Sequence, residues 1–183
     1  MEKYNVLHSE KAFDVIETEG MVGLKSKTMS VAIMPYLVDS QGMIERIGML
    51  KEFNPFRAGG YANTLITGTV ETEDDLLFET VIRELEEEGG YKVPEDQRER
   101  IIFLGAFFPY KDSDRMIPTF AVDVTGLQKN EPAGDGSEKE SLSEFVEVPT
   151  TDVMITSELL PLAAFLKLFN YFIQKSIASN VQS

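Results

Sequence analysis

A nine-residue run, RELEEEGGY at residues 83–91, closes an apolar pattern of helical spacing and ends in two glycines. On a helix, Glu84, Glu87 and Glu88 stand at positions i, i+3 and i+4 and therefore share one face. Three carboxylates placed so close together repel one another unless a positive group lies among them. Mg²⁺ takes oxygen ligands and usually enters proteins together with phosphate, so the run indicates a cation site that handles phosphate.

The residues before this run predict an amphipathic helix over residues 76–88. Its apolar stripe consists of Phe78, Val81, Ile82 and Leu85. Asp74 or Asp75 can cap the first turn, and Gly89 with Gly90 ends the helix. The three glutamates are expected to project beside the stripe, and Glu87 and Glu88 are expected to face solvent. Acid clusters alone are more often a solvated helix face than a site, but the complete spacing of this run favours the cation site.

The composition removes several classes of catalytic site. The chain contains no cysteine, so disulfides, thiolate metal sites and cysteine nucleophiles are excluded. Its single histidine, His8, cannot supply a multi-histidine metal site, and a Ser-His-Asp triad is not expected from so isolated a residue near the N-terminus. Any hydrolytic chemistry must therefore depend on carboxylates, lysine, arginine and a metal ion.

The charge and hydropathy of the chain restrict its partners. A net charge of −14 argues against duplex nucleic acid, because such binding depends on Lys and Arg contacts to phosphate. We find no apolar signal segment at the N-terminus and no stretch of the roughly 20 apolar residues that a membrane span needs. We therefore expect a cytoplasmic protein that binds neither nucleic acid nor membrane.

The other apolar runs predict mostly strands. Strand-forming residues recur through residues 4–30, and strands are expected at 31–39, 44–53, 64–68, 101–110, 116–124 and 144–148. An exposed loop is expected at 129–140, and a long apolar helix at 157–178 that packs on the core or contacts another subunit. The 183 residues suffice for one domain, so the prediction is a single α+β domain in which helices pack against a mixed sheet.

Residues 83–91 resemble the Nudix hydrolase signature, in which a Gly and a Glu precede R-E-U-x-E-E-x-G-U, with U an apolar residue. The second half matches without a gap. The first half departs from the signature: Asp75 takes the Glu position, Thr69 takes the Gly position, and Gly68 lies one residue early. The resemblance implies a Nudix α/β/α sandwich over residues 31–183, preceded by an N-terminal β-strand extension over residues 1–30.

The resemblance also assigns roles. It implies that Mg²⁺, or Mn²⁺, is held by Glu84, Glu87, Glu88 and the main-chain carbonyl of Thr67. Glu84 is in addition a candidate catalytic residue. Structural roles within the signature fall to Gly68, Asp75, Arg83 and Gly90, with Arg83 orienting the acidic loop through Asp75.

Within the Nudix family, the layout is most similar to the ADP-ribose pyrophosphatases. An N-terminal strand region precedes the fold, and Pro109 follows the signature by eighteen residues. In that subfamily an Arg near the position of Arg57 contacts the substrate phosphates, although a surface loop Arg is an equally good explanation here. In that subfamily a Glu on a late loop positions the attacking water, which makes Glu138 and Glu140 the candidate bases. The enzymes of the subfamily also work as homodimers with exchanged N-terminal segments.

The function implied is hydrolysis of the diphosphate bond in a nucleoside diphosphate linked to another moiety, with ADP-ribose or a related nucleotide sugar as the leading substrate. The first alternative keeps the chemistry but changes the substrate to NADH or a nucleoside triphosphate. The second alternative is a Nudix-fold nucleotide-binding or regulatory module without turnover, which the departures at Thr69 and Asp75 favour.

Overall fold

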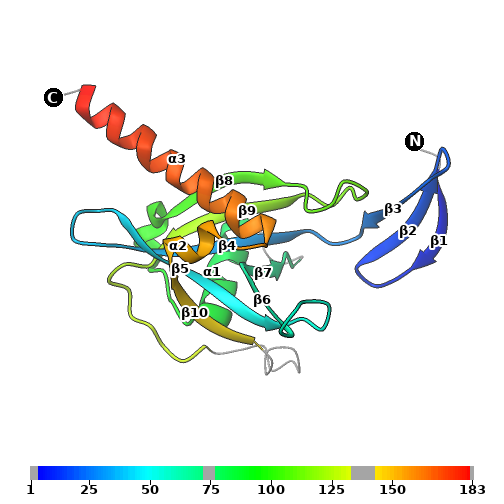
Figure 1. Ribbon diagram of the computed structural model, residues 1–183, viewed down its shortest axis with the longest axis horizontal. Helices are drawn as coiled ribbons and strands as arrows, with labels where there is room; N and C mark the ends of the chain where they lie inside the picture. Colours follow the sequence, from blue (N-terminus) through cyan, green and yellow to red (C-terminus); the bar gives the residue numbers. More distant parts are fainter. Residues whose placement is uncertain (1–3, 72–76, 133–142, 182–183) are drawn as a thin grey trace.

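A computed structural model describes residues 4–71, 77–132 and 143–181 of the chain. Two sheets are present among them, and Figure 1 shows the smaller one standing beyond one end of the larger. The smaller sheet is antiparallel and consists of β1 (Asn5–Ser9), β2 (Phe13–Thr18) and β3 (Met21–Ser26). Strands therefore occupy the N-terminal segment in which the sequence places strand-forming residues.

The larger sheet has seven strands in the described residues. They are β4 (Ser30–Val38), β5 (Ile44–Phe53), β6 (Tyr61–Thr64), β7 (Ile66–Thr69), β8 (Ile101–Phe107), β9 (Ile117–Asp123) and β10 (Ser143–Pro149). The order is β10-β5-β4-β9-β8, with β6 paired to β5 and β7 paired to β4. Because β4 and β9 are parallel while the other pairs are antiparallel, the predicted mixed sheet is confirmed.

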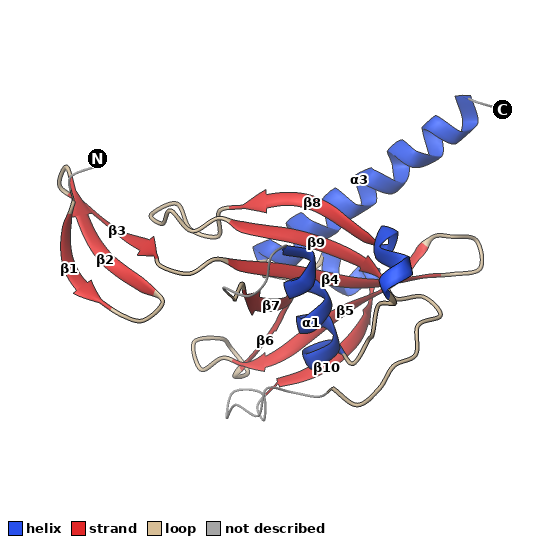
Figure 2. Ribbon diagram, turned by 180° about the vertical axis from the view of Figure 1, so that it is seen from behind, coloured by secondary structure: helices blue, strands red, loops and turns tan. Residues whose placement is uncertain are grey.

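Helices cover both faces of this sheet. They are α1 (Leu77–Gly89), the 3₁₀-helix η1 (Glu95–Arg100), α2 (Thr150–Met154) and α3 (Leu159–Val181). In Figure 1 α2 and α3 lie in front of the sheet, and in the reverse view of Figure 2 α1 lies in front. The predicted α+β class is confirmed, as is the existence of a helix at each of the two predicted places.

Strand β4 separates two cores. Val31 and Ile33 pack with Val81 and Leu85 of α1. The alternate residues Ala32 and Met34 pack in the cluster that α3 covers. Side chains alternate between the two faces of a strand, so a strand covered on both faces is apolar throughout. This explains why the run at residues 31–38 shows no polar alternation.

Three local features differ from the expectation. The predicted strand at 64–68 is two strands, β6 and β7, because the chain leaves β5 at Thr64 and joins β4 from Ile66 onward. The short helices η1 and α2 were not predicted, since pieces of this length carry too few residues to show a helical period. The strands predicted at 101–110 and 116–124 are present as β8 and β9, which pair antiparallel.

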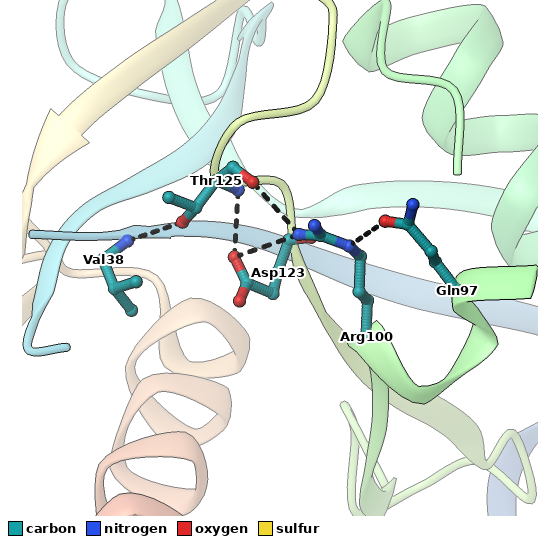
Figure 3. Close-up of polar contacts among 5 residues, drawn as sticks. All are labelled: Val38, Gln97, Arg100, Asp123 and Thr125. Atoms are coloured by element: carbon teal, nitrogen blue, oxygen red, sulfur yellow. Dashed lines mark hydrogen bonds and ion pairs between the residues drawn. The ribbon is translucent and has the colours of Figure 1, made fainter. Parts of the chain in front are cut away.

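Arg100, at the end of η1, connects this helix to the C-terminal end of β9 (Figure 3). Its guanidinium donates to Gln97 Oε1 at 2.7 Å and to the carbonyls of Asp123 and Thr125 at 3.2 and 3.1 Å. The Thr125 hydroxyl in turn accepts from the Val38 amide at 2.9 Å. This network fixes the ends of β4 and β9 that lie farthest from β7.

The N-terminal sheet is tied to the connection between β8 and β9. The Leu24 amide donates to the Asp112 carbonyl at 2.8 Å, and the Ser26 amide donates to the Asp114 carboxylate at 2.7 Å. Apolar side chains of this sheet nevertheless remain exposed, among them Met21 and Val22. The segment is therefore anchored along one edge and leaves apolar surface open.

Helix α3 changes its surroundings along its length. Ala164 and Leu168 are fully buried against the sheet, which confirms core packing for the first half. Ile173 and Ile177 are exposed, and the C-terminal part extends beyond the sheet in Figure 1. Within the described residues, no helix combines the length and apolar character needed to cross a membrane.

Candidate active site

The acidic run lies on the last two turns of α1. Val81 and Leu85 are fully buried and fix the rotation of the helix against the sheet. This rotation leaves Glu87 and Glu88 half-buried, but it turns Glu84 into the protein, where only 8% of the residue is exposed. Glu84 therefore differs from the two other acids of the run, because the backbone of β7 covers it.

Gly68 provides the space that Glu84 occupies. A Cβ atom placed on Gly68 would lie 2.1 Å from the carboxylate carbon of Glu84 and 2.2 Å from one of its oxygens. Real Cβ atoms do not approach other atoms so closely, so a side chain at this position would displace the carboxylate. The backbone of β7 at Gly68, immediately after Thr67, thus passes directly against an acid of α1.

Arg83 joins the acids to the end of β7. Its guanidinium contacts Glu84 Oε1 at 2.7 Å and Glu87 Oε2 at 3.0 Å, and it donates to the Thr69 carbonyl at 3.1 Å. Burial on its own would lower the pKa of Arg83, but the charges and hydrogen bonds of Glu84 and Glu87 outweigh burial and raise it. Arg83 is therefore a permanent positive charge among the acids. Its predicted partner, Asp75, lies outside the described residues.

Gly90 is required where α1 ends. Its φ angle is +74°, and a Cβ atom on it would lie 2.2 Å from the carbonyl oxygen of Asn130. The two residues are joined by a hydrogen bond of 2.9 Å from the Asn130 amide to the Gly90 carbonyl. Only glycine combines the left-handed backbone with room for the passing chain.

Tyr91, at an apolar position of the signature, uses its hydroxyl as well as its ring. The residue is 4% exposed, and its hydroxyl donates to Glu147 Oε1 on β10 at 2.6 Å. Lys129 Nζ reaches the same oxygen at 2.9 Å. Burial alone would raise the pKa of Glu147, but the Tyr91 hydroxyl and the Lys129 charge outweigh it and lower the pKa. The end of α1 is thereby fixed to β10.

We expect Tyr91→Phe to lower the free energy of unfolding by about 1 kcal/mol at pH 7, because a buried hydrogen bond to a carboxylate is lost. A lowered carboxyl pKa stabilises the folded state above the unfolded pKa, and this contribution disappears as pH falls through the folded pKa. The deficit of the variant should therefore shrink below the ordinary Glu value of 4.5.

Urea unfolding of both proteins at pH 7 and pH 4 measures this difference. Tyr110→Phe, which removes an exposed hydroxyl, is the matched control and should change neither value. A deficit of equal size at the two pH values would show that the hydroxyl does not act through the Glu147 carboxylate.

The donor set suits a hard divalent cation in its chemistry. Three carboxylates of one helical face lie beside a β7 backbone whose Thr67 carbonyl is a further oxygen, and oxygen donors are those that Mg²⁺ prefers. Within the described residues, no three acidic or histidine side chains converge on a single point. Glu84 and Glu87 instead converge on Arg83. The donors are therefore of the chemical type that the ion takes, and in this structure Arg83 lies in the middle of the set.

The other predicted site residues are not brought to this cluster. Arg57 lies in the connection between β5 and β6 and forms a 2.9 Å ion pair with Glu158, at the start of the helix that covers the opposite face of the sheet. Glu138 and Glu140 lie outside the described residues. Sequence reasoning missed the Thr69 carbonyl as a partner of Arg83, since a main-chain acceptor leaves no trace in residue type.

Comparisons with known proteins show the fold of this chain. No family model and no curated protein matches the sequence. A solved structure described as "Crystal structure of ADP compounds hydrolase" is similar to this chain, with a TM-score of 0.63 and 15% sequence identity. The match covers 94% of this chain and 93% of the chain in that structure. The chain therefore has the fold of a Nudix hydrolase, in agreement with the resemblance of residues 83–91.

Proposed function

We propose that the protein is a Mg²⁺-dependent pyrophosphohydrolase that cleaves the diphosphate bond of a nucleoside diphosphate linked to another moiety, with ADP-ribose or a related nucleotide sugar as substrate. The observation that carries this proposal is the seating of the Glu84 carboxylate against Gly68 under the guanidinium of Arg83. An exposed acidic helix face has no need of a glycine cradle. The cradle lies in a fold shared with a hydrolase of ADP compounds.

Each residue of the cluster has a role in this proposal. Glu84, Glu87, Glu88 and the Thr67 carbonyl would hold the cation. The chemistry that a bound divalent cation supplies is neutralisation of the diphosphate charge and a lower pKa for a bound water. Arg83 orients Glu84 by its 2.7 Å contact and restrains Glu87. Gly68 keeps the space for the Glu84 carboxylate open.

The base that receives the proton of the attacking water is proposed to be Glu138 or Glu140. General-base assistance typically contributes about 10²–10⁴-fold, so its loss should appear in kcat. We expect Glu140→Gln to lower kcat more than Glu138→Gln, since Glu140 is closer in sequence to β10. Steady-state kinetics of both variants and of the double variant measure this. Full kcat in all three would move the role to Glu84 or Glu144.

A panel of compounds tests the proposed function as a whole. Release of phosphate or monophosphate products is measured with Mg²⁺ for ADP-ribose, nucleotide sugars, NADH and nucleoside triphosphates. Cleavage of a sugar-linked diphosphate in preference to the others supports the proposal, and preference for NADH or a triphosphate supports the same chemistry on another substrate. The departures at Thr69 and Asp75 favour a binding module without turnover, which would bind such compounds and cleave none.

We further propose that the protein is a homodimer. Val22 of β3 and Leu7 of β1 are more than half exposed. Exposed apolar surface of this kind on the N-terminal sheet indicates a contact with another protein chain. Wild-type protein should show twice its chain mass of 20.5 kDa by light scattering at micromolar concentration. Val22→Asp should yield monomers, whereas Met43→Asp, at an exposed turn, should not. A wild-type mass of 20.5 kDa would defeat the proposal.

A further inference from the structure

A polar pocket of about 360 Å³ lies on the face of the sheet that α2 and α3 cover. It opens between β6, the connection from β5 to β6, and the connection from α2 to α3; Figure 1 shows α2 and the start of α3 in front of the sheet here. The residues that matter for its chemistry are Arg57, Tyr61, Asn63, Asp152, Ser157 and Glu158. The pocket is thus separate from the acidic face of α1.

The pocket presents hydrogen-bonding groups that the protein does not use. Arg57 and Glu158 fix each other through their 2.9 Å ion pair and so hold one wall in place. The Asn63 amide and the Ser157 hydroxyl form no side-chain hydrogen bond to the part of the chain that the structure describes. Within the described residues, the Asp152 carboxylate accepts one side-chain hydrogen bond, at 3.3 Å from the neighbouring Thr151 hydroxyl. Donors and acceptors therefore stand together at one opening.

The balance of charge selects a neutral ligand. Asp152 and Glu158 contribute two carboxylates and Arg57 one guanidinium, so a phosphate group would meet net negative charge in the pocket. Hydroxyl groups both donate and accept, and they satisfy carboxylates, an amide and a guanidinium together. A group with several neighbouring hydroxyls, which is a sugar, fits this lining.

Tyr61 argues against an aromatic base as the occupant. Lys51 Nζ lies over the Tyr61 ring, 5.0 Å from its centroid, and Phe53 meets the ring edge to face at 5.9 Å between centroids. The ring is therefore already engaged by two residues of β5. Base recognition commonly relies on a free aromatic face for stacking, and Lys51 and Phe53 already lie against this half-exposed ring.

The pocket is connected to the acidic cluster through one stretch of backbone. Asn63 lines the pocket, and Gly68, five residues later, abuts Glu84. Five extended residues span at most about 18 Å, so the pocket and the cluster adjoin the same short stretch of β6 and β7, which lies between β5 and β4 in the sheet. We propose that this pocket binds the sugar moiety of the substrate while the acidic cluster receives the diphosphate. This inference rests on the proposed function.

Ribose 5-phosphate, titrated into the ¹⁵N-labelled full-length protein and followed by NMR, tests the pocket directly. We expect saturable shifts of the Asn63 and Ser157 amides, and no such shifts with inorganic phosphate. Asn63→Ala and Asp152→Asn should each raise the dissociation constant at least about tenfold, the effect of losing a hydrogen bond to a charged or buried group. Glu99→Gln, an exposed acid of η1, is the control and should leave the constant unchanged.

Equal shifts with inorganic phosphate, or ribose 5-phosphate shifts that avoid the pocket, would overturn the inference. Kinetics separate it from the proposed function. If the wild type cleaves ADP-ribose and Asp152→Asn raises KM while kcat is unchanged, the proposed function and the sugar pocket are both supported. If it cleaves ADP-ribose and KM is unchanged in both pocket variants, the inference fails and the function stands. If it cleaves no diphosphate but ribose 5-phosphate binds at Asn63, the sugar pocket stands and the function fails.

Discussion

Gly68→Ala should lower the turnover of the protein by at least about a hundredfold, because the new methyl group takes the place of the Glu84 carboxylate. The added Cβ atom would lie 2.1 Å from the carboxylate carbon, so Glu84 must leave its contact with Arg83. Forcing one methyl group into a filled site typically costs about 1–3 kcal/mol of stability, which a domain of this size survives.

The kinetic effect of Gly68→Ala is measured by kcat and KM with ADP-ribose and Mg²⁺, alongside thermal unfolding. Thr64→Ala, at the end of β6, is the control for a small change in the same run of strand and should retain the wild-type rate. A folded Gly68→Ala protein with wild-type turnover would show that the position of Glu84 does not matter for the reaction. That result would remove the observation on which the proposed function depends.

The second large effect is expected for Glu87→Gln and Glu88→Gln, each lowering turnover by at least about a hundredfold. Glutamine keeps the shape of the side chain but removes the charge that holds a divalent cation, whose stabilisation of the developing charge is worth several kcal/mol. Because the helix face loses repulsion, the melting temperature in metal-free buffer should stay level or rise.

Glu86→Gln is the matched control for these two substitutions. Glu86 lies on the same turn of α1 but points to Lys92, at 3.4 Å, rather than to Arg83. Its variant should keep the wild-type rate and the wild-type dependence on Mg²⁺. Near-wild-type rates in both Glu87→Gln and Glu88→Gln would remove the metal assignment, whereas a loss confined to these two would locate the ion on the acidic face.

Much of the fold could be predicted because its strands carry strong local patterns. The apolar run that starts at Val31 predicts a strand, and β4 is present there, covered on both faces. The division of the next prediction into β6 and β7 could not be foreseen. It depends on which strand each residue pairs with, and pairing is a long-range property that leaves the local pattern unchanged.

For the candidate site, too, the residue spacing predicts which side chains share a helix face but not which residues they contact. The spacing of the glutamates predicts that they share one face of α1, but spacing alone does not reveal that Glu84 is buried against Gly68. The hydrogen bond between Tyr91 and Glu147 joins residues that are 56 positions apart, and the ion pair of Arg57 with Glu158 joins residues 101 apart. Contacts over such distances follow from the fold rather than from any local motif.

The account is tested most directly by the products formed when the purified protein is incubated with ADP-ribose and Mg²⁺. We predict stoichiometric AMP and ribose 5-phosphate, with cleavage abolished by EDTA and lowered at least about a hundredfold in Glu88→Gln. The absence of cleavage of ADP-ribose, nucleotide sugars, NADH and nucleoside triphosphates by folded wild-type protein, with Mg²⁺ or Mn²⁺, would contradict the proposed hydrolytic function.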